Sequence, residues 1–437
     1  MDKIVAVVGA GYVGLTTAAG MAHLGHRVVC VDIDEQKIDR LRHNHVDLAE
    51  PNLPELVARY LRHGRLSFHT RLEHAVPAAA TVFLCLPTPA SPEDAVDMHA
   101  IDTVTHRLAT LARPDSTIVV KSTVPPGTNR RLTDLLQRDD VTLVSNPEFL
   151  REGSSLHDFL NPQRIVIGAH CSAAAHHVAQ LYATDAPVLT TDPISAEMIK
   201  YATNSYLAMK LAYSNTLAEL CEHTGANITD VLTGIGHDSR IGASYLRPGP
   251  GWGGPCLPKD TRALLAIGNA TGCDIPLLRA ALEANAHHQR RVVKIVEHAL
   301  HRQLAGCHIG VLGMTFKPGT NDLRDSPALP ITTMLAARHA HVHAYDPGLS
   351  TPVAGLTDHL TLTTSAAEAL AGCDLALLLT DWPEFASLPW NSLAARMRGN
   401  IVVDTRNQLD PTYLAEAGLH VRALGSPLPD LPAVRTA

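Results

Sequence analysis

Cys256 stands where the neighbouring residue types could support nucleophilic chemistry. It follows the glycine- and proline-rich segment GPGWGGP and precedes a helical pattern that contains Pro258. Proline suits the first turn of a helix, so the pattern places the thiol near a helix N-terminus, with Lys259 nearby. The helix dipole and the lysine charge both favour the thiolate. The context predicts a nucleophile, whereas the other seven cysteines are interpreted as small buried apolar residues.

Three polar residues could assist such a nucleophile. Asp260, four residues after Cys256, could bond a catalytic water or an ammonium group, or merely stabilise the helix N-terminus. Lys200 and Asn204 are four residues apart in EMIKYATNSYLA and therefore share one helix face. The pair could hold an alkoxide or an oxyanion. Without further context, a solvated helix face is the more favoured interpretation of the pair.

Four further polar residues follow the ends of predicted strands, where ligands bind in open α/β sheets. Glu148 and Glu152 stand in SNPEFLREG, and a carboxylate there could act as a general base. Thr123 in KSTVPPGT and Thr88 in LPTP take similar places. The alternatives are surface charges for the glutamates and ordinary turn residues for the threonines.

The segment GAGYVG predicts a dinucleotide-binding turn. Gly9, Gly11 and Gly14 stand between a strand pattern and a helical pattern, so a tight turn can bring the helix N-terminus against a pyrophosphate. Asp32 ends the second strand pattern, where a carboxylate can bond a ribose diol and would repel a 2′-phosphate. These features predict NAD rather than NADP, with a glycine-rich structural turn as the alternative.

The elements that must position these residues fall into three regions. Residues 1–190 alternate strand-like runs with helical patterns, which implies parallel strands with crossover helices. Residues 191–303 carry long helical stretches, and residues 304–437 resume the alternation with HIGVLG, HVHAYDP, LALLLT and NIVVDT. The predicted fold is α/β, with two Rossmann-like, doubly wound parallel-sheet domains joined by a helical middle region that contains a long central helix. The strands predicted in the first region are Lys3–Val8, Arg27–Val31, Thr81–Leu86, Thr117–Val120, Val141–Ser145 and Arg164–Ile167.

Composition argues against several classes of protein. The 437 residues include 36 Lys and Arg against 43 Asp and Glu, with no long basic run, which gives no support to a nucleic-acid partner. The 25 His show no zinc-ligand spacing, so we expect no metal site. No apolar stretch is long enough for a membrane span, the N-terminus lacks a signal-peptide pattern, and the eight Cys are dispersed. We therefore expect a cytoplasmic globular protein that does not bind membranes.

Seven motifs occur in one order along the chain: GAGYVG, LPTP, STVPPGT, NPEFLREG, EMIKYATNSYLA, GPGWGGPCLPKD and GMTFKPGTNDLRDSP. In this order they resemble the UDP-glucose/GDP-mannose dehydrogenase family over nearly the whole chain. The resemblance implies an oxidoreductase that uses two NAD in sequence to oxidise the C6 alcohol of a nucleotide-linked hexose to a carboxylate. It also implies a cysteine-bound thiohemiacetal, followed by a thioester that water hydrolyses.

The same resemblance implies a role for each region and for individual residues. Residues 1–190 would bind NAD, residues 191–303 would carry the catalytic cysteine and the dimer interface, and residues 304–437 would bind the nucleotide sugar. The implied catalytic residues are Cys256 as nucleophile, Lys200 and Asn204 as oxyanion stabilisers, Glu152 as base for hydrolysis, and Asp260 and Thr123 as groups that position Lys200 or a water.

The resemblance further implies the ligand contacts and a homodimer. The long middle helix would form the dimer core, and Arg240 would be donated across the interface. The implied NAD contacts are Gly9, Gly11, Tyr12, Val13, Gly14, Asp32, Lys37, Thr88, Thr123, Glu152, Lys259 and Arg324. The implied nucleotide-sugar contacts are Glu148, Phe149, Leu150, Arg151, Glu152, Lys200, Asn204, Arg240, Tyr245, Leu246, Arg247, Pro248, Gly249, Gly253, Lys317 and Arg406.

Three places depart from the family's commoner spelling, which puts the exact sugar in question. Pro255 precedes the cysteine where Ser is commoner, Trp252 stands where Phe is usual, and LPTP replaces a GTP-type loop. LREGSSLHDFLNPQRIVIG resembles the glucose-type members, so UDP-glucose is the expected substrate, with GDP-mannose, TDP-glucose and a UDP-N-acetylhexosamine as alternatives. Two other classes stay open: a two-electron β-hydroxyacid dehydrogenase and a non-catalytic sensor of NAD or nucleotide sugars.

Overall fold

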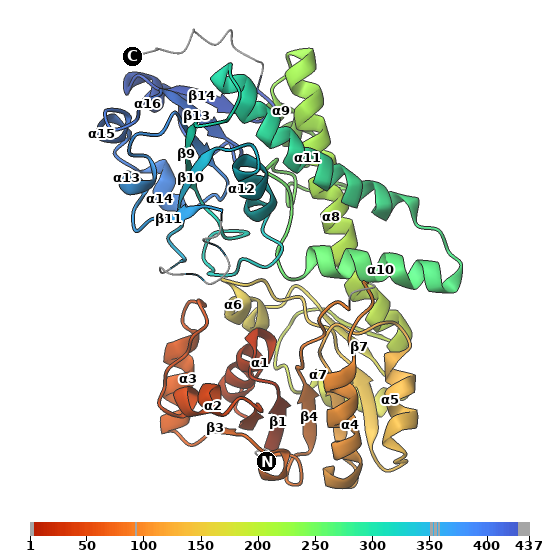
Figure 1. The fold of residues 1–437 in the computed structure, drawn as a ribbon. Coiled ribbons are helices and arrows are strands. Elements are labelled where there is room, and N and C mark those ends of the chain that lie inside the picture. Colours follow the sequence, from red (N-terminus) through yellow and green to blue (C-terminus); the bar gives the residue numbers. More distant parts are fainter. Residues whose placement is uncertain (1–3, 92–93, 350–352, 354–355, 357–358, 427–437) are drawn as a thin grey trace. The chain divides into compact units, whose positions relative to one another are not determined.

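The computed structural model describes residues 4–91, 94–349, 353, 356 and 359–426 (Figure 1). The chain folds into two compact units. One consists of Met1–Thr203 and Arg262–Thr271, and the other of Asn204–Thr261 and Gly272–Ala437. Two helices belong to both units: α8 (Pro193–Thr224) begins in the first and ends in the second, whereas α10 (Leu257–Thr271) begins in the second and ends in the first.

The first unit is built on a sheet that has eight strands within the described residues, in the order β3-β2-β1-β4-β5-β6-β7-β8. Neighbouring strands are parallel except β6 and β7, which pair antiparallel. The sequence pattern did not predict β3, which has four residues, or β8, an edge strand with mostly exposed side chains. Lys3, where the first predicted strand begins, lies outside the described residues. The strands are β1 (Ile4–Val8), β2 (Arg27–Val31), β3 (Leu66–His69), β4 (Thr81–Leu84), β5 (Thr117–Val120), β6 (Thr142–Ser145), β7 (Ile165–Gly168) and β8 (Val188–Thr191).

Alternate residues of these strands pack into two cores, because successive side chains of a strand point to opposite faces of the sheet. Val5 and Val7 of β1 belong to one core, and Ala6 and Val8 to the other. The first core is covered by α1 (Tyr12–His23), α2 (Glu35–Arg42), α3 (Leu53–Arg62), α6 (Ser155–Leu160) and α7 (Ser172–Ala179). The second core is covered by α4 (His99–Leu111) and α5 (Thr128–Leu136), with the short helix η1 (Leu72–His74) alongside.

The second unit repeats this plan with a parallel sheet that has six strands within the described residues, in the order β11-β10-β9-β12-β13-β14. The strands are β9 (His308–Leu312), β10 (His341–Tyr345), β11 (Thr361–Leu362), β12 (Leu375–Leu378), β13 (Ile401–Asp404) and β14 (His420–Ala423). One face is covered by α11 (Pro276–Leu300) and α12 (Ala328–Ala336), and the other by α13 (Ala366–Ala369), α14 (Pro383–Ala386), α15 (Trp390–Ala394) and α16 (Pro411–Glu416). The predicted pair of doubly wound sheets is confirmed.

The helical middle region contains the predicted long helix, α8, which has 32 residues. Helix α9 (Ile228–Gly236) packs on the second half of α8 through Ala218, Cys221, Ile228 and Leu232. Across the part of the chain that the structure describes, no helix has both the length and the apolar character that a membrane crossing requires.

Candidate active site

The glycine-rich turn between β1 and α1 has the shape that a pyrophosphate needs at a helix N-terminus. Gly9 has φ +99°, and a Cβ there would lie 2.3 Å from the carbonyl oxygen of Cys85. A Cβ on Gly14 would lie 1.8 Å from the carbonyl oxygen of Gly9. By contrast, among the described residues nothing beyond its chain neighbours lies within 4 Å of a Cβ built on Gly11, the N-cap of α1. The turn therefore has no space for a side chain at Gly9 or Gly14, whereas the space beside Gly11 is open.

Asp32 follows β2, and its carboxylate is fixed against this turn. Its Oδ2 accepts a hydrogen bond from the backbone N–H of Ala10 at 2.8 Å and lies 3.2 Å from Lys37 Nζ. Its Oδ1 accepts from the backbone N–H of Asp34 at 3.0 Å. The side chain is 12% exposed, so part of the carboxylate remains accessible to a ligand over the turn. These residues fit an NAD ribose diol.

Tyr12 connects the turn to the segment that carries Glu152. Its hydroxyl donates to Glu50 and accepts from the backbone N–H of Gly153. The second oxygen of Glu50 accepts from the backbone N–H of Leu156 at 3.1 Å. Burial and the bond to Glu50 raise the pKa of Tyr12. The sequence analysis missed Glu50, because nothing local marks a buried carboxylate whose partners are distant in the chain.

Thr88 and Thr123 lie beyond the ends of the neighbouring strands β4 and β5, and both are half-buried. Ser122 joins the two segments, since its hydroxyl donates to the carbonyl oxygen of Leu86 at 2.8 Å. The carboxyl ends of parallel strands meet at one edge of a sheet, so both threonines lie at the edge where the glycine-rich turn lies. The molecules they bind stay predictions.

Lys200 of α8 forms a buried ion pair with Glu148, which follows β6. Lys200 Nζ lies 2.8 Å from Glu148 Oε1, and the side chains are 4% and 8% exposed. Burial acts to raise the pKa of Glu148, but the charge and hydrogen bond of Lys200 outweigh it and hold the pKa below its ordinary value. Glu148 therefore stays an anion and supports the ammonium group beside it. The sequence analysis named both residues but did not predict the pair.

The remaining residues of the segment after β6 differ in how firmly they are held. The ring centroid of Phe149 lies 3.9 Å from the guanidinium carbon of Arg164 and 5.5 Å from Lys200 Nζ. Arg151 is largely exposed and pairs with Asp158 at 2.6 Å. Leu150 and Glu152 are half-buried. Arg164 was missed by the sequence analysis, although it stands at the start of a predicted strand.

In the second unit, Cys256 lies immediately before α10, as the sequence predicts. Its carbonyl oxygen accepts from the backbone N–H of Asp260 at 2.9 Å, which is the first hydrogen bond of the helix, and its side chain is exposed. Cys171 and Cys273 are also exposed, so the prediction that the other cysteines are buried is wrong for these two. Both lie near a helix end, where the side chain does not face a core. The prediction is confirmed for the five buried cysteines, Cys30, Cys85, Cys221, Cys307 and Cys373.

Asp260 is 1% exposed and joins two neighbours. Its Oδ2 accepts from Asn204 Nδ2 at 2.6 Å, and its Oδ1 pairs with Lys259 Nζ at 2.6 Å. A carboxylate in the first turn of α10 also opposes the positive end of the helix dipole. The sequence analysis expected Asp260 to hold a water or an ammonium group, and Lys259 is an ammonium group that it holds.

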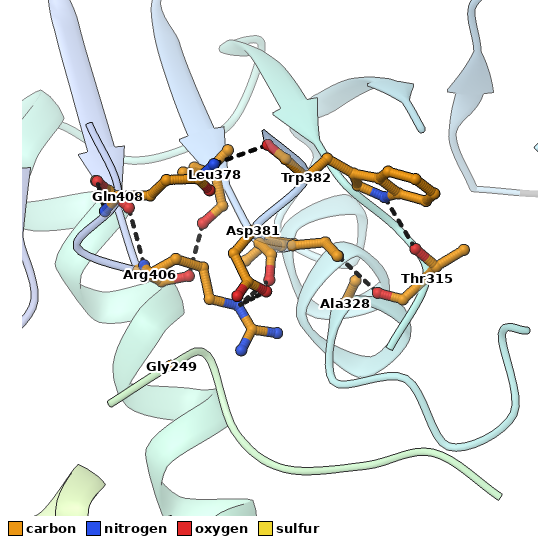
Figure 2. A network of polar contacts seen from close by, with 12 residues as sticks. Gly249, Thr315, Ala328, Leu378, Asp381, Trp382, Arg406 and Gln408 are labelled. Atoms are coloured by element: carbon orange, nitrogen blue, oxygen red, sulfur yellow. Dashed lines mark hydrogen bonds and ion pairs between the residues drawn. The ribbon is translucent and has the colours of Figure 1, made fainter. Parts of the chain in front are cut away.

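Arg406 follows the carboxyl end of β13, an inner strand of the second sheet (Figure 2). Its Nε donates to the carbonyl oxygen of Leu379 at 2.8 Å and lies 3.7 Å from Asp381 Oδ1. A Cβ built on Gly249 would lie 2.8 Å from Arg406 Nη1, so a glycine gives the guanidinium its room. Burial lowers the pKa of Arg406. A poorly solvated guanidinium would gain from an anion such as a diphosphate.

Side chains from three segments support this part of the second sheet, and the sequence analysis missed them. Gln408 Nε2 donates to the carbonyl oxygen of Trp382 at 2.8 Å, and Trp382 Nε1 donates to Thr315 Oγ1 at 3.2 Å (Figure 2). The three residues follow β13, β12 and β9. Their place after strand carboxyl ends was the signal that could have identified them.

The other residues predicted to contact ligands in this unit are distributed over two loops. Arg240 and Arg324 are mostly exposed, and each pairs with an acid two residues earlier, Asp238 and Asp322. Lys317 Nζ lies 5.5 Å from the ring centroid of the preceding residue. Leu246, Pro248 and Gly249 are buried, Tyr245 and Gly253 are half-buried, and Arg247 is exposed. Within the described residues, no group of three or more His, Cys, Asp or Glu is arranged to hold a metal ion.

Comparison with known proteins covers both units. Residues 3–185 match the NAD binding domain of the UDP-glucose/GDP-mannose dehydrogenase family, residues 194–287 its central domain, and residues 310–411 its UDP binding domain. A UDP-glucose 6-dehydrogenase of Rhizobium meliloti (strain 1021) is 38% identical in an alignment of 434 positions that covers 97% of this chain and 99% of that protein.

Solved structures agree with this match. A UDP-glucose dehydrogenase from the archaeon Pyrobaculum islandicum superposes with a TM-score of 0.89 at 35% identity, over 98% of each chain. A UDP-D-ManNAc dehydrogenase from Pyrococcus horikoshii superposes with a TM-score of 0.85 at 28% identity, over 97% of this chain and 99% of that one. The protein is an NAD-dependent nucleotide-sugar dehydrogenase of the UDP-glucose 6-dehydrogenase type. It belongs to the UDP-glucose/GDP-mannose dehydrogenase family.

Proposed function

We propose that this enzyme oxidises UDP-glucose at C6 to UDP-glucuronate and reduces two NAD for each sugar. The observation that carries the proposal is the exposed thiol of Cys256 at the N-terminus of α10, next to the buried Asp260. A covalent thiol adduct lets a dehydrogenase carry an alcohol past the aldehyde without releasing it. The names of the relatives from R. meliloti and P. islandicum support UDP-glucose as the substrate.

Coenzyme binding is assigned to residues 1–190. NAD accepts a hydride in each of the two oxidations. The N-terminus of α1 and the open space at Gly11 would bind the pyrophosphate, and Asp32 would bond the ribose diol. The further contacts proposed are Gly9, Tyr12, Val13, Gly14, Lys37, Thr88, Thr123, Glu152, Lys259 and Arg324.

Cys256 acts after the first oxidation, when C6 is an aldehyde. The thiolate adds to the carbonyl carbon, so a C–S bond forms and the carbonyl electrons move to oxygen, which gives a thiohemiacetal. Loss of a hydride from C6 then leaves a thioester on the sulfur. Glu152 is the proposed base that takes a proton from the attacking water. The C–S bond breaks, the sulfur leaves as thiolate, and C6 becomes the carboxylate.

Lys200 and Asn204 are proposed to stabilise the C6 oxygen whenever it gains negative charge. Glu148 supports the Lys200 ammonium group, and Asp260 orients the Asn204 amide. Thr123 and Asp260 are proposed to position a water or the lysine.

Nucleotide-sugar binding is assigned to residues 304–437, together with residues of the segment after β6, of α8 and of the loop before α10. The half-buried guanidinium of Arg406 suits a diphosphate. GDP-mannose, TDP-glucose and a UDP-N-acetylhexosamine are the alternative substrates, and the name of the P. horikoshii protein keeps the last of these open. The proposed contacts are Glu148, Phe149, Leu150, Arg151, Glu152, Lys200, Asn204, Arg240, Tyr245, Leu246, Arg247, Pro248, Gly249, Gly253, Lys317 and Arg406.

We also propose a homodimer formed through residues 191–303. Tyr206, Tyr213 and Leu220 are spaced seven residues apart on α8 and are 55–57% exposed. Large apolar side chains at this spacing form one stripe along a helix, which suits packing against a second copy of the helix. Arg240 is 87% exposed and is proposed to reach the substrate of the partner subunit.

Product stoichiometry tests the proposed function. The purified enzyme is incubated with NAD and, in separate reactions, UDP-, TDP- and GDP-linked sugars, and the products are identified by mass. We expect UDP-glucuronate and two NADH per sugar from UDP-glucose. One NADH per sugar with an aldehyde or ketone product would replace this proposal with a two-electron dehydrogenase, and binding without NADH formation would indicate a sensor.

A further inference from the structure

Four backbone groups in the loop before Cys256 are bonded by side chains of α8 and α11. The N–H of Gly249 donates to Asn215 Oδ1 at 2.9 Å, and the carbonyl oxygen of Gly249 accepts from His288 Nε2 at 2.7 Å. The N–H of Trp252 donates to Asn285 Oδ1 at 2.9 Å, and the carbonyl oxygen of Trp252 accepts from Asn285 Nδ2 at 2.9 Å. The loop has no regular secondary structure, so these bonds replace those that a helix or strand would supply.

These bonds lie in the interior of the second unit. Asn215 is 4% exposed, His288 is 3% exposed and Trp252 is 3% exposed. Burial lowers the pKa of His288 to about 4, so its ring is neutral at physiological pH. Because a carbonyl oxygen only accepts, the neutral ring must carry its proton on Nε2. A buried backbone group without these bonds would lose its hydrogen bonds to water and gain no replacement, so each of the three side chains has a defined task.

The loop is also held by close packing. The indole of Trp252 packs with Ala208 and Ala212 of α8 and Ala281 of α11, so the larger ring fills space between two helices that carry small side chains. Gly251 has φ +136°, and a Cβ there would lie 2.9 Å from Asn285 Oδ1. A side chain at this position would therefore displace the same amide that bonds Trp252.

We propose that Asn215, Asn285 and His288 are positioning residues that hold the Gly249–Trp252 segment and thereby fix Cys256 at the N-terminus of α10. The inference rests on the proposed function, because Cys256 is the proposed nucleophile and Gly249 a proposed substrate contact. Only three residues lie between Trp252 and Cys256, so we expect a shift of the backbone at Trp252 to move the thiol as well. Displacements of about 1 Å from productive geometry can cost on the order of 100-fold in rate.

The test compares two α11 variants with a matched control. Asn285→Ala removes both bonds to Trp252, and His288→Leu removes the bond to Gly249. His287→Ala is the control, because His287 is the neighbouring residue, is 60% exposed, and faces Glu219 rather than the loop. His288→Gln is a rescue variant, since a glutamine amide can place an N–H donor close to the position of imidazole Nε2.

We expect kcat to fall about tenfold or more in Asn285→Ala and His288→Leu, with an unchanged KM for NAD. The control should keep the parent kcat, and His288→Gln should recover most of it. Circular dichroism should find the variants folded. A kcat within twofold of the parent in both Asn285→Ala and His288→Leu would overturn the inference.

Thiol reactivity separates positioning from a merely structural role. Alkylation of Cys256 by iodoacetamide is followed by peptide mass spectrometry, which distinguishes it from the exposed Cys171 and Cys273. A thiol that leaves the helix N-terminus loses the dipole that favours its thiolate, so its alkylation profile should shift to higher pH in Asn285→Ala and not in His287→Ala. An unshifted profile would contradict the inference. This readout needs no substrate, so it stands even where the stoichiometry experiment overturns the proposed function.

Discussion

The six strands of the second sheet repeat the order of β1 to β6 in the first sheet, but the two sheets present different surfaces to a nucleotide. After β1 the chain makes a turn of residues 9–11, and α1 begins at Tyr12. After β9 it makes a loop of residues 313–327, and α12 begins only at Ala328. At the carboxyl end of β1 the first sheet therefore presents a helix N-terminus, whereas at the carboxyl end of β9 the second sheet presents loop side chains such as Lys317. We therefore expect the first sheet to bind the dinucleotide through backbone groups, and the second to bind the nucleotide sugar through cationic side chains.

The acids that follow the second strand of each sheet differ in the same way. Asp32 after β2 bonds the N–H of Ala10 and keeps 12% exposure. Asp346 after β10 is 1% exposed and accepts from the N–H groups of Met314, Thr315 and Gly348 and from the Thr315 hydroxyl. With these four internal donors, the carboxylate joins the loop after β9 to the loop after β10. An acid at this position therefore indicates a ribose contact only where the structure leaves it accessible.

The largest expected effect is a loss of acid formation when Cys256 is replaced, without a loss of NAD affinity. Cys256→Ser should lower acid formation by more than about 1,000-fold, because a hydroxyl is a far weaker nucleophile than a thiolate. NAD affinity, measured by fluorescence titration, should stay within about twofold of the parent because the coenzyme turn is in the first unit. Unchanged acid formation would mean that the thiol is not involved.

Arg406 tests the assignment of the second sheet to the nucleotide sugar. Arg406→Leu should raise the KM for the sugar about 100-fold through the loss of a charge-assisted bond, and should leave the KM for NAD unchanged. Arg422→Leu is the matched control, since Arg422 is another arginine of this unit with a buried side chain that bonds a carbonyl oxygen of α11. An equal effect of the two variants on sugar KM would remove the special role of Arg406.

Acidification should weaken the second unit before the first. In the unfolded chain His288 binds a proton near pH 6.5, whereas in the folded chain its lowered pKa delays protonation to about pH 4. Stability is therefore lost as pH falls through this window, by about 2 kcal/mol between pH 7 and pH 5. The lowered pKa of Glu148 has its effect only below about pH 4.5. Hydrogen exchange at pH 7 and pH 5 should therefore accelerate in α11 more than in the sheet of the first unit, and His288→Gln should remove the difference.

The smallest expected effect is on coenzyme binding, when Asp32 or Asp346 is replaced by Asn. Asp32→Asn should weaken NAD binding about tenfold and raise the relative use of NADP, because the ribose loses its acceptor and the 2′-phosphate loses a repelling charge. Asp346→Asn should lower Tm and leave the NAD to NADP ratio unchanged, since in the described contacts Asp346 bonds the loop after β9 and Gly348, both in the second unit. A changed coenzyme preference in Asp346→Asn would contradict the comparison.

The sequence by itself determined the features that depend on neighbouring residues. The turn at Gly9–Gly14, the start of α10 after Cys256 and the central strands of both sheets follow from local patterns of glycine, proline and apolar residues. These patterns act within a few residues, so they can be recognised without the fold. The edge strand β8 was not predicted because its four residues contain only two apolar side chains, Val188 and Leu189, which is too short a run to show a strand pattern.

Only the tertiary structure decided which side chains meet. Lys200 pairs with Glu148, Asn204 bonds Asp260, and Asn285 bonds the backbone of Trp252, across separations of 52, 56 and 33 residues. The chain must fold before such groups can desolvate one another, and no periodicity encodes their encounter. The sequence therefore predicted which residues could be reactive, and the fold determined their partners and hence their charge and orientation.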